Sequence, residues 1–280
     1  MIAGIDESGR GPVLASMVMA IAATEDEEGL RKRGVRDSKD LTPEKREQLF
    51  EQLDIPHEII SVSPAEIDAA VDGQHDNLNL LEARTSALLI HKLVQHTPVE
   101  KVILDSPTKS TEKYEAVVRE ALVKLDPKHE HLTLQCEIKA DANYPVVGAA
   151  SIFAKVTRDR EIAALKEEFG DIGSGYPADP KTQAFLKSQW KEGHDFFRKS
   201  WQSYKRMSQP TLEDFGEKAP EHKKEVEKFE FLKEHGFSFC EPTNQYEVIR
   251  MKKDRTTVIK YTTGKVVVQG PEKEAVEKLL

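Results

Sequence analysis

Short apolar runs alternate along this chain with segments whose apolar residues recur at helical spacing, and this alternation constrains the fold most. The runs typical of strands cover residues 2–5, 13–23, 57–64, 101–105 and 131–141. Helical patterns follow Thr42 and recur at 78–95, at 146–169 and at 182–190. Alternating strands and helices without an internal repeat predict an α/β domain.

Local signals refine this prediction. Residues 2–5 and 13–23 are separated by a Gly/Pro turn, so we expect two adjacent strands. Thr42 precedes Pro43, which is the pattern of a helix N-cap followed by proline in the first turn, so DSKD at 37–40 is a loop. In the last strand one buried face is predicted from alternating residues, namely Leu132, Leu134, Cys136 and Ile138.

The residue composition changes after Arg206. Residues 207–219 are polar and rich in turn formers, which predicts a linker. Residues 220–280 contain one helical pattern, three strand-like runs and a final helical pattern. We therefore expect a main domain at 1–206 and a small α+β domain with an antiparallel sheet at 220–280.

The composition limits the functional class. The formal net charge is −8 with 32% charged residues, so any nucleic acid would have to meet a local basic surface. Cys136 and Cys240 lie far apart and lack metal-ligand spacing, which favours a reducing compartment. The first residues lack the pattern of a secretory leader, and no apolar run reaches about 18 residues. We expect a cytoplasmic monomer without membrane association.

Four acids stand out by their position. Asp6 and Glu7 end the first strand, Asp105 ends another, and Asp141 follows a third. If these ends adjoin at one sheet edge, the carboxylates converge, and oxygen-rich sites of this kind suit Mg²⁺ or Mn²⁺. Two such ions serve phosphodiester hydrolysis. The alternative is that each acid is a turn or helix-cap residue.

Five motifs occur in order over residues 1–205: GIDESGRGP, DSKDLT, LDSP, ADANYPVVGAASIFAKVTRDR and GSGYPADPKT. They resemble those of ribonuclease HII, the type 2 ribonuclease H, in its archaeal form. The resemblance implies a ribonuclease H-like fold, a central mixed sheet flanked by helices. It implies metal-dependent endonucleolytic cleavage of RNA in RNA/DNA hybrids and incision 5′ of single ribonucleotides in DNA, leaving 3′-hydroxyl and 5′-phosphate ends. The roles implied are ribonucleotide and primer removal. The metal-binding acids implied are Asp6, Glu7, Asp105 and Asp141.

The resemblance also assigns substrate contacts. Gly9, Arg10 and Gly11 match a loop whose backbone reads the ribose 2′-hydroxyl, which distinguishes RNA from DNA. Tyr176 matches a tyrosine that packs on the sugar beside the RNA-to-DNA junction, and Ser38 with Lys39 matches a phosphate-binding loop. Without the resemblance, Tyr176 would be interpreted as an ordinary half-buried loop residue and Lys39 as a solvated one.

Two positions depart from the family pattern. Asn143 stands where a lysine is usual, and Gly148 where serine or alanine is usual. The first removes a positive charge near the metal or phosphate, for which Lys139, Lys155 or Arg158 is a candidate substitute. One alternative function is therefore a binding protein that cuts poorly. Another is a DNA-cutting two-metal nuclease, which is disfavoured because the 2′-hydroxyl loop would have no purpose there.

A short peptide in the linker resembles a sliding-clamp binding motif. Gln209, Leu212 and Phe215 have its spacing, but Gly216 stands where a second aromatic residue is common. The alternative is a linker with incidental apolar residues.

The tail resembles half of the TATA-binding-protein fold, as found in the N-terminal domain of ribonuclease HIII, with Gly264, Lys265, Gln269 and Gly270 as markers. This implies a sheet that holds hybrid duplex, with phosphate contacts from Arg250, Lys252, Lys253, Arg255, Lys260 and Lys265. The alternative is a set of solvated lysines on an exposed face.

Overall fold

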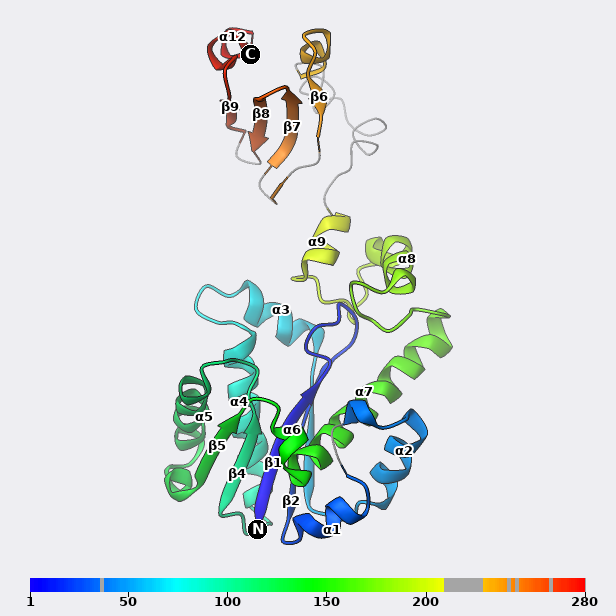
Figure 1. Ribbon diagram of the computed structural model, residues 1–280, viewed down its shortest axis with the longest axis vertical. Coiled ribbons are helices and arrows are strands. Elements are labelled where there is room, and N and C mark those ends of the chain that lie inside the picture. The colour runs from blue at the N-terminus through cyan, green and yellow to red at the C-terminus, as the bar shows by residue number, and fades with distance from the viewer. Residues whose placement is uncertain (36–37, 209–228, 241–242, 245–246, 262–263, 280) are drawn as a thin grey trace. The chain divides into compact units, whose positions relative to one another are not determined.

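The computed structural model describes the chain except for residues 36–37, 209–228, 241–242, 245–246, 262–263 and 280 (Figure 1). It divides into two compact units, Met1–Ser208 and Gln209–Leu280, which we treat separately. Most of the predicted linker at 207–219 and the first part of the predicted tail helix lie outside the described residues.

The first unit is built on a five-stranded mixed sheet with the order β3-β2-β1-β4-β5. Its strands are β1 Ile2–Ser8, β2 Met17–Thr24, β3 His57–Val62, β4 Lys101–Asp105 and β5 Thr133–Glu137. Strands β1, β2 and β3 pair antiparallel, whereas β1, β4 and β5 pair parallel. The carboxyl ends of the three parallel strands therefore share one edge of the sheet.

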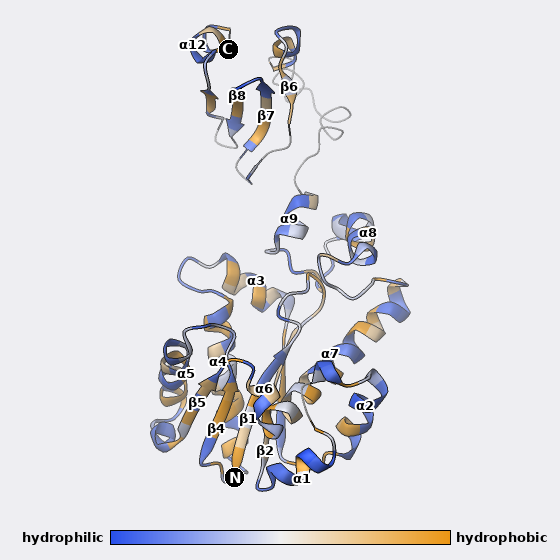
Figure 2. Cartoon of the chain, viewed as in Figure 1, coloured by the Kyte–Doolittle hydropathy of each residue, from blue (hydrophilic) through white to orange (hydrophobic). Residues whose placement is uncertain are grey.

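Helices cover both faces of this sheet. One face packs against α3 Pro64–Asp72, α4 Leu78–Val94 and α5 Thr111–Leu125. The other packs against α1 Glu27–Lys32, α2 Pro43–Gln52 and α7 Pro145–Phe169, with the short helix α6 Ala140–Asn143 just before α7. Figure 2 shows hydrophobic residues concentrated along the strands between these layers. The remaining elements are α8 Pro180–Gln189, α9 Gln202–Ser208 and the 3₁₀ helices η1 Ser38–Asp40, η2 Pro127–His131 and η3 Trp190–Glu192.

The predicted cap of α2 is confirmed. The Thr42 side chain accepts a hydrogen bond from the Lys45 N–H, and Pro43 occupies the first turn, so two of the unpaired N–H positions of that turn are accounted for. This cap ends the DSKD segment as a loop and a single 3₁₀ turn, η1. The local sequence thus fixes where the loop stops and α2 begins.

Close contact between β1 and α7 depends on Gly4. A Cβ atom at Gly4 would lie 2.5 Å from the backbone nitrogen of Val147, so no larger residue fits without displacing the helix. The first turns of α7 are small, as expected from the GAAS segment, and Ala149 and Ala150 are fully buried. This contact brings the α7 residue Ser151 to the end of β1.

Two expectations for the first unit are wrong. Residues 13–16 are not part of a strand, because Val13 and Ala15 donate their N–H groups to Gly175 and Phe196 across a separate hydrophobic cluster. Ile138 is 50% exposed, because β5 ends at Glu137 before that position. Apolar character alone cannot distinguish a buried loop from a strand.

The second unit contains an antiparallel sheet with the order β6-β7-β8-β9. The strands are β6 Ser238–Phe239, β7 Glu247–Lys253, β8 Thr256–Tyr261 and β9 Val266–Gln269. Residues 229–234 are helical, and α12 Lys273–Glu277 follows β9. The core includes Leu232, Met251 and Val258. The α/β class with a separate antiparallel α+β sheet is confirmed, although β6 was too short to be predicted.

Within the described parts of both units, no helix has the length and apolar character needed to cross a membrane.

Candidate functional site

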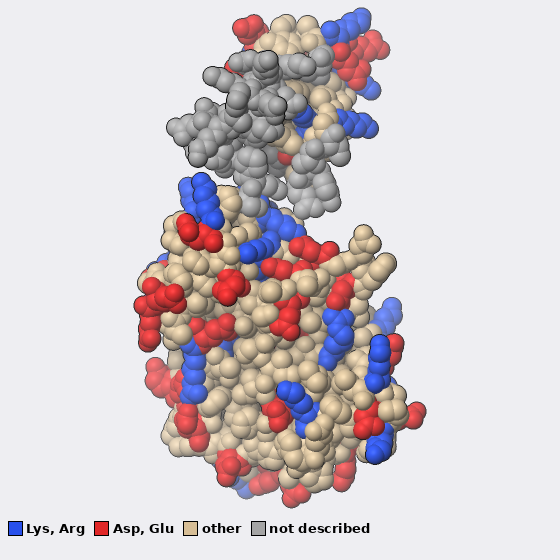
Figure 3. Space-filling model, turned by 180° about the vertical axis from the view of Figure 1, so that it is seen from behind, with Lys and Arg blue, Asp and Glu red and all other residues tan. Residues whose placement is uncertain are grey.

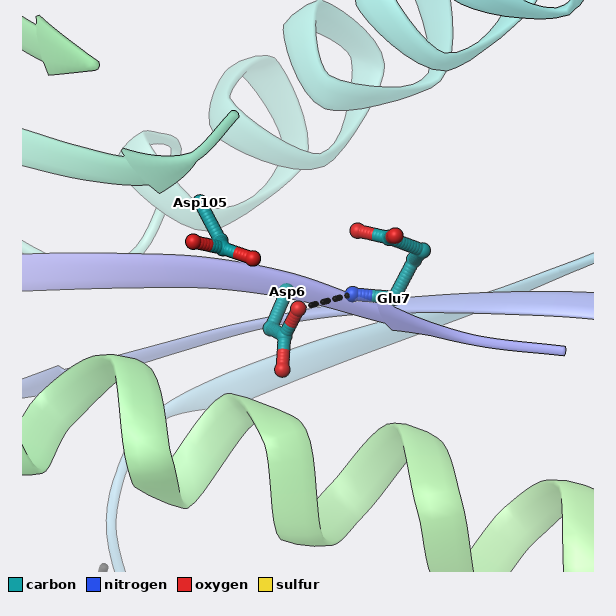
Figure 4. Close-up of side chains that lie close together, drawn as sticks. All are labelled: Asp6, Glu7 and Asp105. Atoms are coloured by element: carbon teal, nitrogen blue, oxygen red, sulfur yellow. Dashed lines mark hydrogen bonds between the residues drawn. The ribbon is translucent and has the colours of Figure 1, made fainter. Parts of the chain in front are cut away.

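Three of the four predicted acids meet at the shared edge of the sheet. Asp6 and Glu7 lie near the end of β1, and Asp105 ends β4, whose register with β1 places Ile5 beside Leu104. Each acid contributes one carboxylate oxygen to a group in which all these atoms lie within 4.8 Å of one another (Figure 4). Consecutive strand residues point to opposite faces, so Asp6 faces α7 while Glu7 faces α4.

The fourth acid, Asp141, lies on α6 rather than on a strand. The Ala140 N–H at the start of this helix donates a 2.7 Å hydrogen bond to Asp105 Oδ1, which attaches α6 to the end of β4. Asp141 is 3% exposed and its Oδ2 lies 3.4 Å from Lys39 Nζ. Asp141 is outside the group of three but contributes to the electrostatics of both Asp6 and Asp105.

Burial and mutual repulsion raise the pKa values of this cluster. Burial raises the pKa of Asp6 well above its usual value, and the charges of Glu7, Asp105 and Asp141 raise it further, against a hydrogen bond from Ser151. Asp6 is only 5% exposed, so water does not screen these charges effectively. The cluster thus holds more negative charge than its surroundings stabilise.

The other two acids show the same effect. Burial, together with the charges of Glu82 and Asp105, raises the pKa of Glu7 to about 8, although Arg10 opposes the shift. Burial also raises the pKa of Asp105 to about 6, although the hydrogen bond from Ala140 opposes the shift. The residues therefore fit a bound cation, because a divalent ion would replace the protons that the crowded carboxylates otherwise retain.

The donor set indicates which cations fit. In the parts of the chain that the structure describes, this cluster is the one group of three or more metal-ligating side chains close enough to share an ion. It offers carboxylate oxygens and neither imidazole nor thiolate. Such a set favours hard cations, of which Mg²⁺ and Mn²⁺ are the ones used with phosphate substrates.

The predicted phosphate loop is joined to the cluster through two serines. Ser38 is buried, and its Oγ lies 2.8 Å from Ser151 Oγ, the hydroxyl that also bonds Asp6. Buried Arg46 of α2 donates to the carbonyls of Ser38 and Leu41 at 2.9 and 2.7 Å. Lys39, with its side chain 77% exposed, extends from this fixed loop beside the carboxylates.

The Gly9–Gly11 loop follows directly after β1. Gly9 has φ +85°, and a Cβ atom there would lie 2.4 Å from the Arg158 side chain, so both backbone and space require glycine. The Arg10 guanidinium reaches back to α4, where it donates to Glu82 Oε1 at 2.7 Å and Asn79 Oδ1 at 2.6 Å. Arg10 thus holds the loop and does not extend freely into solvent.

Tyr176 lies beside this loop. A Cβ atom at Gly11 would be 3.4 Å from its ring, and the ring is 46% exposed. The guanidinium of Arg158 lies 5.8 Å from the ring centroid on the protein side. The exposed ring therefore borders the same surface as the loop and is available to stack on a flat group.

Asn143 lies near Glu137. The Tyr144 hydroxyl and then the Gln135 amide lower the pKa of the Glu137 carboxyl, and the Asn143 side chain makes a smaller contribution in the same direction. Of the three candidate substitutes for the missing charge, Lys155 pairs with Asp159 and Arg158 packs against Gly9. Lys139 acts on Asp105 through its backbone N–H. Lys39 is the cation that lies beside Asp141.

Sequence reasoning missed the residues that hold the loops. Glu82 is an acid within the mostly apolar α4, and its 1% exposure marks it as a partner for Arg10. Arg198 is fully buried and donates to the carbonyls of Gly9 and Arg10 in the Gly9–Gly11 loop. A charged residue inside an apolar helix was the available signal for Glu82, since such residues are rarely buried without a partner. Arg198 stands in a mostly polar segment and offered no such signal.

The tail cations differ in their surroundings. Arg250 pairs with Glu247, Lys253 pairs with Glu272, and Lys260 is only 8% exposed and lies over the Phe229 ring. The exposed ones are Lys252, Arg255 and Lys265. The register places Lys252, Thr257 and Gln269 in one row across three strands. In the first unit, Figure 3 shows Lys and Arg interspersed with Asp and Glu over the visible face.

The predicted clamp peptide, at Gln209, Leu212 and Phe215, lies outside the described residues.

Comparison with known proteins gives a consistent match. The family model of ribonuclease HII matches residues 3–204. Ribonuclease HII of Pyrococcus horikoshii is 39% identical over 228 residues, covering 76% of this chain and 98% of the relative. That of Thermofilum pendens is 42% identical over 216 residues, covering 74% and 98%. Among solved structures, the PCNA:RNase HII complex from Archaeoglobus fulgidus aligns with a TM-score of 0.65 and 38% identity, covering 76% of this chain and 100% of the other.

Because of the carboxylate cluster, we expect the free energy of unfolding of the metal-free protein to fall as the pH rises, whereas ion-paired carboxylates usually make it rise. The pKa values of Glu7 and Asp105 in the folded protein, about 8 and 6, lie above their ordinary values of 4.5 and 3.8. The folded state therefore binds these protons more tightly, and their stabilising effect is lost as the pH rises from about 4 to about 8. We expect Asp6→Asn to relieve the repulsion and raise the melting temperature of chelator-treated protein by about 3–6 °C near pH 8.

This gain should shrink near pH 5, where the parent carboxylates regain their protons. Asp54→Asn is the control, because it removes the same charge from an exposed position. Thermal unfolding followed by circular dichroism measures both variants. Equal melting temperatures for Asp6→Asn and the parent near pH 8 would contradict the prediction.

Proposed function

The chain belongs to the ribonuclease HII family, which cleaves RNA in RNA/DNA hybrids, and we propose that it also incises 5′ of single ribonucleotides embedded in DNA. The products proposed are 3′-hydroxyl and 5′-phosphate ends. The observation that carries this proposal is the convergence of Asp6, Glu7 and Asp105 at one sheet edge, next to a loop that can approach a sugar.

The proposed cofactor is Mg²⁺ or Mn²⁺, held by Asp6, Glu7, Asp105 and Asp141. When bound, such ions activate water and stabilise the leaving oxygen of a phosphodiester. The chain itself supplies orientation, because the hydrogen bonds from Ser151 and Ala140 fix the Asp6 and Asp105 carboxylates. Burial shields Asp6 in particular from bulk water.

Substrate recognition is proposed for two loops. The Gly9–Gly11 backbone would contact the ribose 2′-hydroxyl, and Tyr176 would stack on the adjoining sugar. Ser38 and Lys39 would contact phosphate. The exposed Lys39 side chain would supply the positive charge, and the buried Ser38 beside it holds the loop in place. These loops flank the carboxylates, which supports a scissile phosphate next to a recognised ribose.

The two alternative functions remain distinguishable. The binding-protein alternative rests on Asn143, whose side chain acts on Glu137, an acid that is not one of the three clustered carboxylates. The DNA-nuclease alternative gives no purpose to the Gly9–Gly11 loop. Both therefore have less support than ribonucleotide-directed cleavage.

We expect the parent protein to cut a duplex containing one ribonucleotide with Mg²⁺ or Mn²⁺, and to leave the all-DNA duplex intact. Asp6→Asn should reduce kcat at least about 100-fold, since even groups that merely orient metal ligands are worth about 10- to 100-fold. Gel analysis of end-labelled strands measures rate and cut position.

Asp54→Asn serves as the surface-charge control. A parent that binds the duplex without cutting it in either metal, and that gains cleavage as Asn143→Lys, would establish the binding-protein alternative instead. Cutting of the all-DNA duplex at a similar rate would establish the DNA nuclease.

A sliding clamp is the proposed protein partner. The relative from Archaeoglobus fulgidus was solved in complex with PCNA and is 38% identical to this chain. Gln209, Leu212 and Phe215 supply a matching peptide directly after the first unit. Apolar side chains that fill a partner pocket commonly dominate the affinity of such peptides.

We expect the double variant Leu212→Ala/Phe215→Ala to weaken binding to an archaeal PCNA-type clamp at least about 30-fold, because the loss of even one anchor residue costs about 2 kcal/mol. Calorimetry measures the affinity. Glu213→Ala is the control within the same peptide and should bind within about twofold of the parent. Equal affinity of the double variant and the parent would exclude this peptide as the contact.

The second unit is proposed to hold hybrid duplex through its exposed cations. Lys252, Arg255 and Lys265 are the predicted contacts that have exposed side chains, whereas Lys260 is buried. Phosphate contacts would make the affinity fall steeply with salt.

We expect the triple variant Lys252→Gln/Arg255→Gln/Lys265→Gln to bind a hybrid duplex more weakly and with a salt slope smaller by about 2 to 3, near 0.9 per lost phosphate contact. Fluorescence anisotropy over a series of salt concentrations measures both the affinity and its salt slope. The control is Lys32→Gln/Lys124→Gln/Lys128→Gln, which removes equal charge from exposed sites of the first unit. Identical slopes for both triple variants would contradict the tail's role.

A further inference from the structure

The three carbonyl groups of the Gly9–Gly11 loop are all bonded to one short segment. The Arg198 guanidinium donates to Gly9 O at 2.6 Å and to Arg10 O at 3.0 Å. The indole Nε1 of Trp201 donates to Gly11 O at 3.0 Å. Each carbonyl of the loop therefore points toward the turn at residues 198–201.

These bonds determine where the loop's N–H groups point. In a planar trans peptide, the carbonyl of one residue and the N–H of the next point in opposite directions. Holding the Gly9 and Arg10 carbonyls against the turn therefore directs the N–H groups of Arg10 and Gly11 away from it. Neither N–H has an acceptor among the residues that the structure describes.

The N–H groups of Arg10 and Gly11 lie next to exposed surface. Gly11 is exposed and Tyr176, with its exposed ring, borders it. Two adjacent N–H groups without partners beside an exposed aromatic ring form a donor pair for an oxygen of an incoming molecule. A hydroxyl or phosphate oxygen of a sugar-phosphate chain has the required chemistry.

The anchoring turn is itself fixed. Arg198 also donates through Nε to Ala15 O at 2.9 Å and is fully buried. Asp68 of α3 accepts hydrogen bonds from the N–H groups of Lys199 and Ser200 at 2.7 and 2.9 Å. The turn is therefore held from two sides, and the loop's peptide planes are set before any substrate arrives.

We propose that Arg198 and Trp201 are positioning residues, which orient the loop so that the Arg10 and Gly11 N–H groups bind the ribose 2′-hydroxyl and its neighbouring phosphate. The proposal rests on the proposed function, to which it adds the two residues that orient the loop for binding a ribose in preference to a deoxyribose. Arg198 and Trp201 act through the loop and touch neither the substrate nor the carboxylates.

The test compares Trp201→Phe, Arg198→Lys and the parent. Phenylalanine keeps a ring beside the Arg198 guanidinium, which lies 5.1 Å from the indole centroid, but it cannot donate to Gly11 O. Lysine keeps the charge of Arg198 but cannot bond several carbonyls through a rigid fork. Each is matched against Trp190→Phe, made at the other partly buried tryptophan of the same hydrophobic cluster.

Two quantities are measured for each variant. The first is the ratio of affinities, in chelator, for a duplex with one ribonucleotide and the same duplex in all-DNA form, by fluorescence anisotropy. The second is the pair kcat and KM for the ribonucleotide duplex. We expect the affinity ratio to fall, and KM to rise, about three- to tenfold in Trp201→Phe and Arg198→Lys, with kcat retained. Trp190→Phe should match the parent.

A merely structural role predicts a different pattern. A partly unfolded variant loses active protein, so its apparent kcat falls while KM and the affinity ratio stay at the parent values. That pattern in Trp201→Phe, or parent values throughout in both variants, overturns the proposal. A parent that neither discriminates the duplexes nor cleaves one of them overturns the proposed function, whereas a discriminating parent with equally discriminating variants overturns the positioning role alone.

Discussion

The parallel pairing of β1 with β4 is the constraint on which the rest of the first unit depends. It places Asp6 and Glu7 beside Asp105 at the carboxyl ends of two neighbouring strands. Burial and repulsion raise all three pKa values, so in the absence of a cation this arrangement costs stability. Destabilising arrangements of this kind are typical of functional sites. A divalent ion that binds the cluster in the folded state raises the free energy of unfolding again.

Buried arginines fix both of the loops for which substrate contacts are proposed. Arg46 bonds two carbonyls of the segment around Ser38, and Arg198 bonds two carbonyls of the Gly9–Gly11 loop. A guanidinium suits this task because its donors are held in a rigid fork, and hydrogen bonds to a charged group are worth about 1.5–3 kcal/mol each. Both loops can therefore hold one conformation although they contain little helix or strand.

The sequence predicted the sheet, the helices α2, α4, α7 and α8, and the three clustered acids, because strand ends and helix caps are local signals. It did not predict α3 or α5. Residues 13–16 and Ile138 were interpreted wrongly, since apolar character does not reveal whether a residue is buried in a strand or a loop. Arg198 could not be predicted, because its partners at Gly9 and Arg10 lie nearly the whole unit away along the chain. Long-range bonds from side chain to carbonyl leave no periodic trace in a sequence.

In the proposed function, β1 and the loop after it join the metal-binding acids to the substrate-recognition loop over a few residues. Asp6 and Glu7 belong to the strand, whereas Gly9 leaves it with a positive φ, so the loop turns where the sheet register ends. The strand is fixed by its neighbours and by α7 against Gly4, while the loop is fixed by Arg198, Trp201 and α4. With both parts held independently, the distance from the loop to the carboxylates is set by the backbone between them. If the loop binds the ribose as proposed, the position of the cut relative to that sugar follows from covalent geometry, and side-chain flexibility has little influence on it.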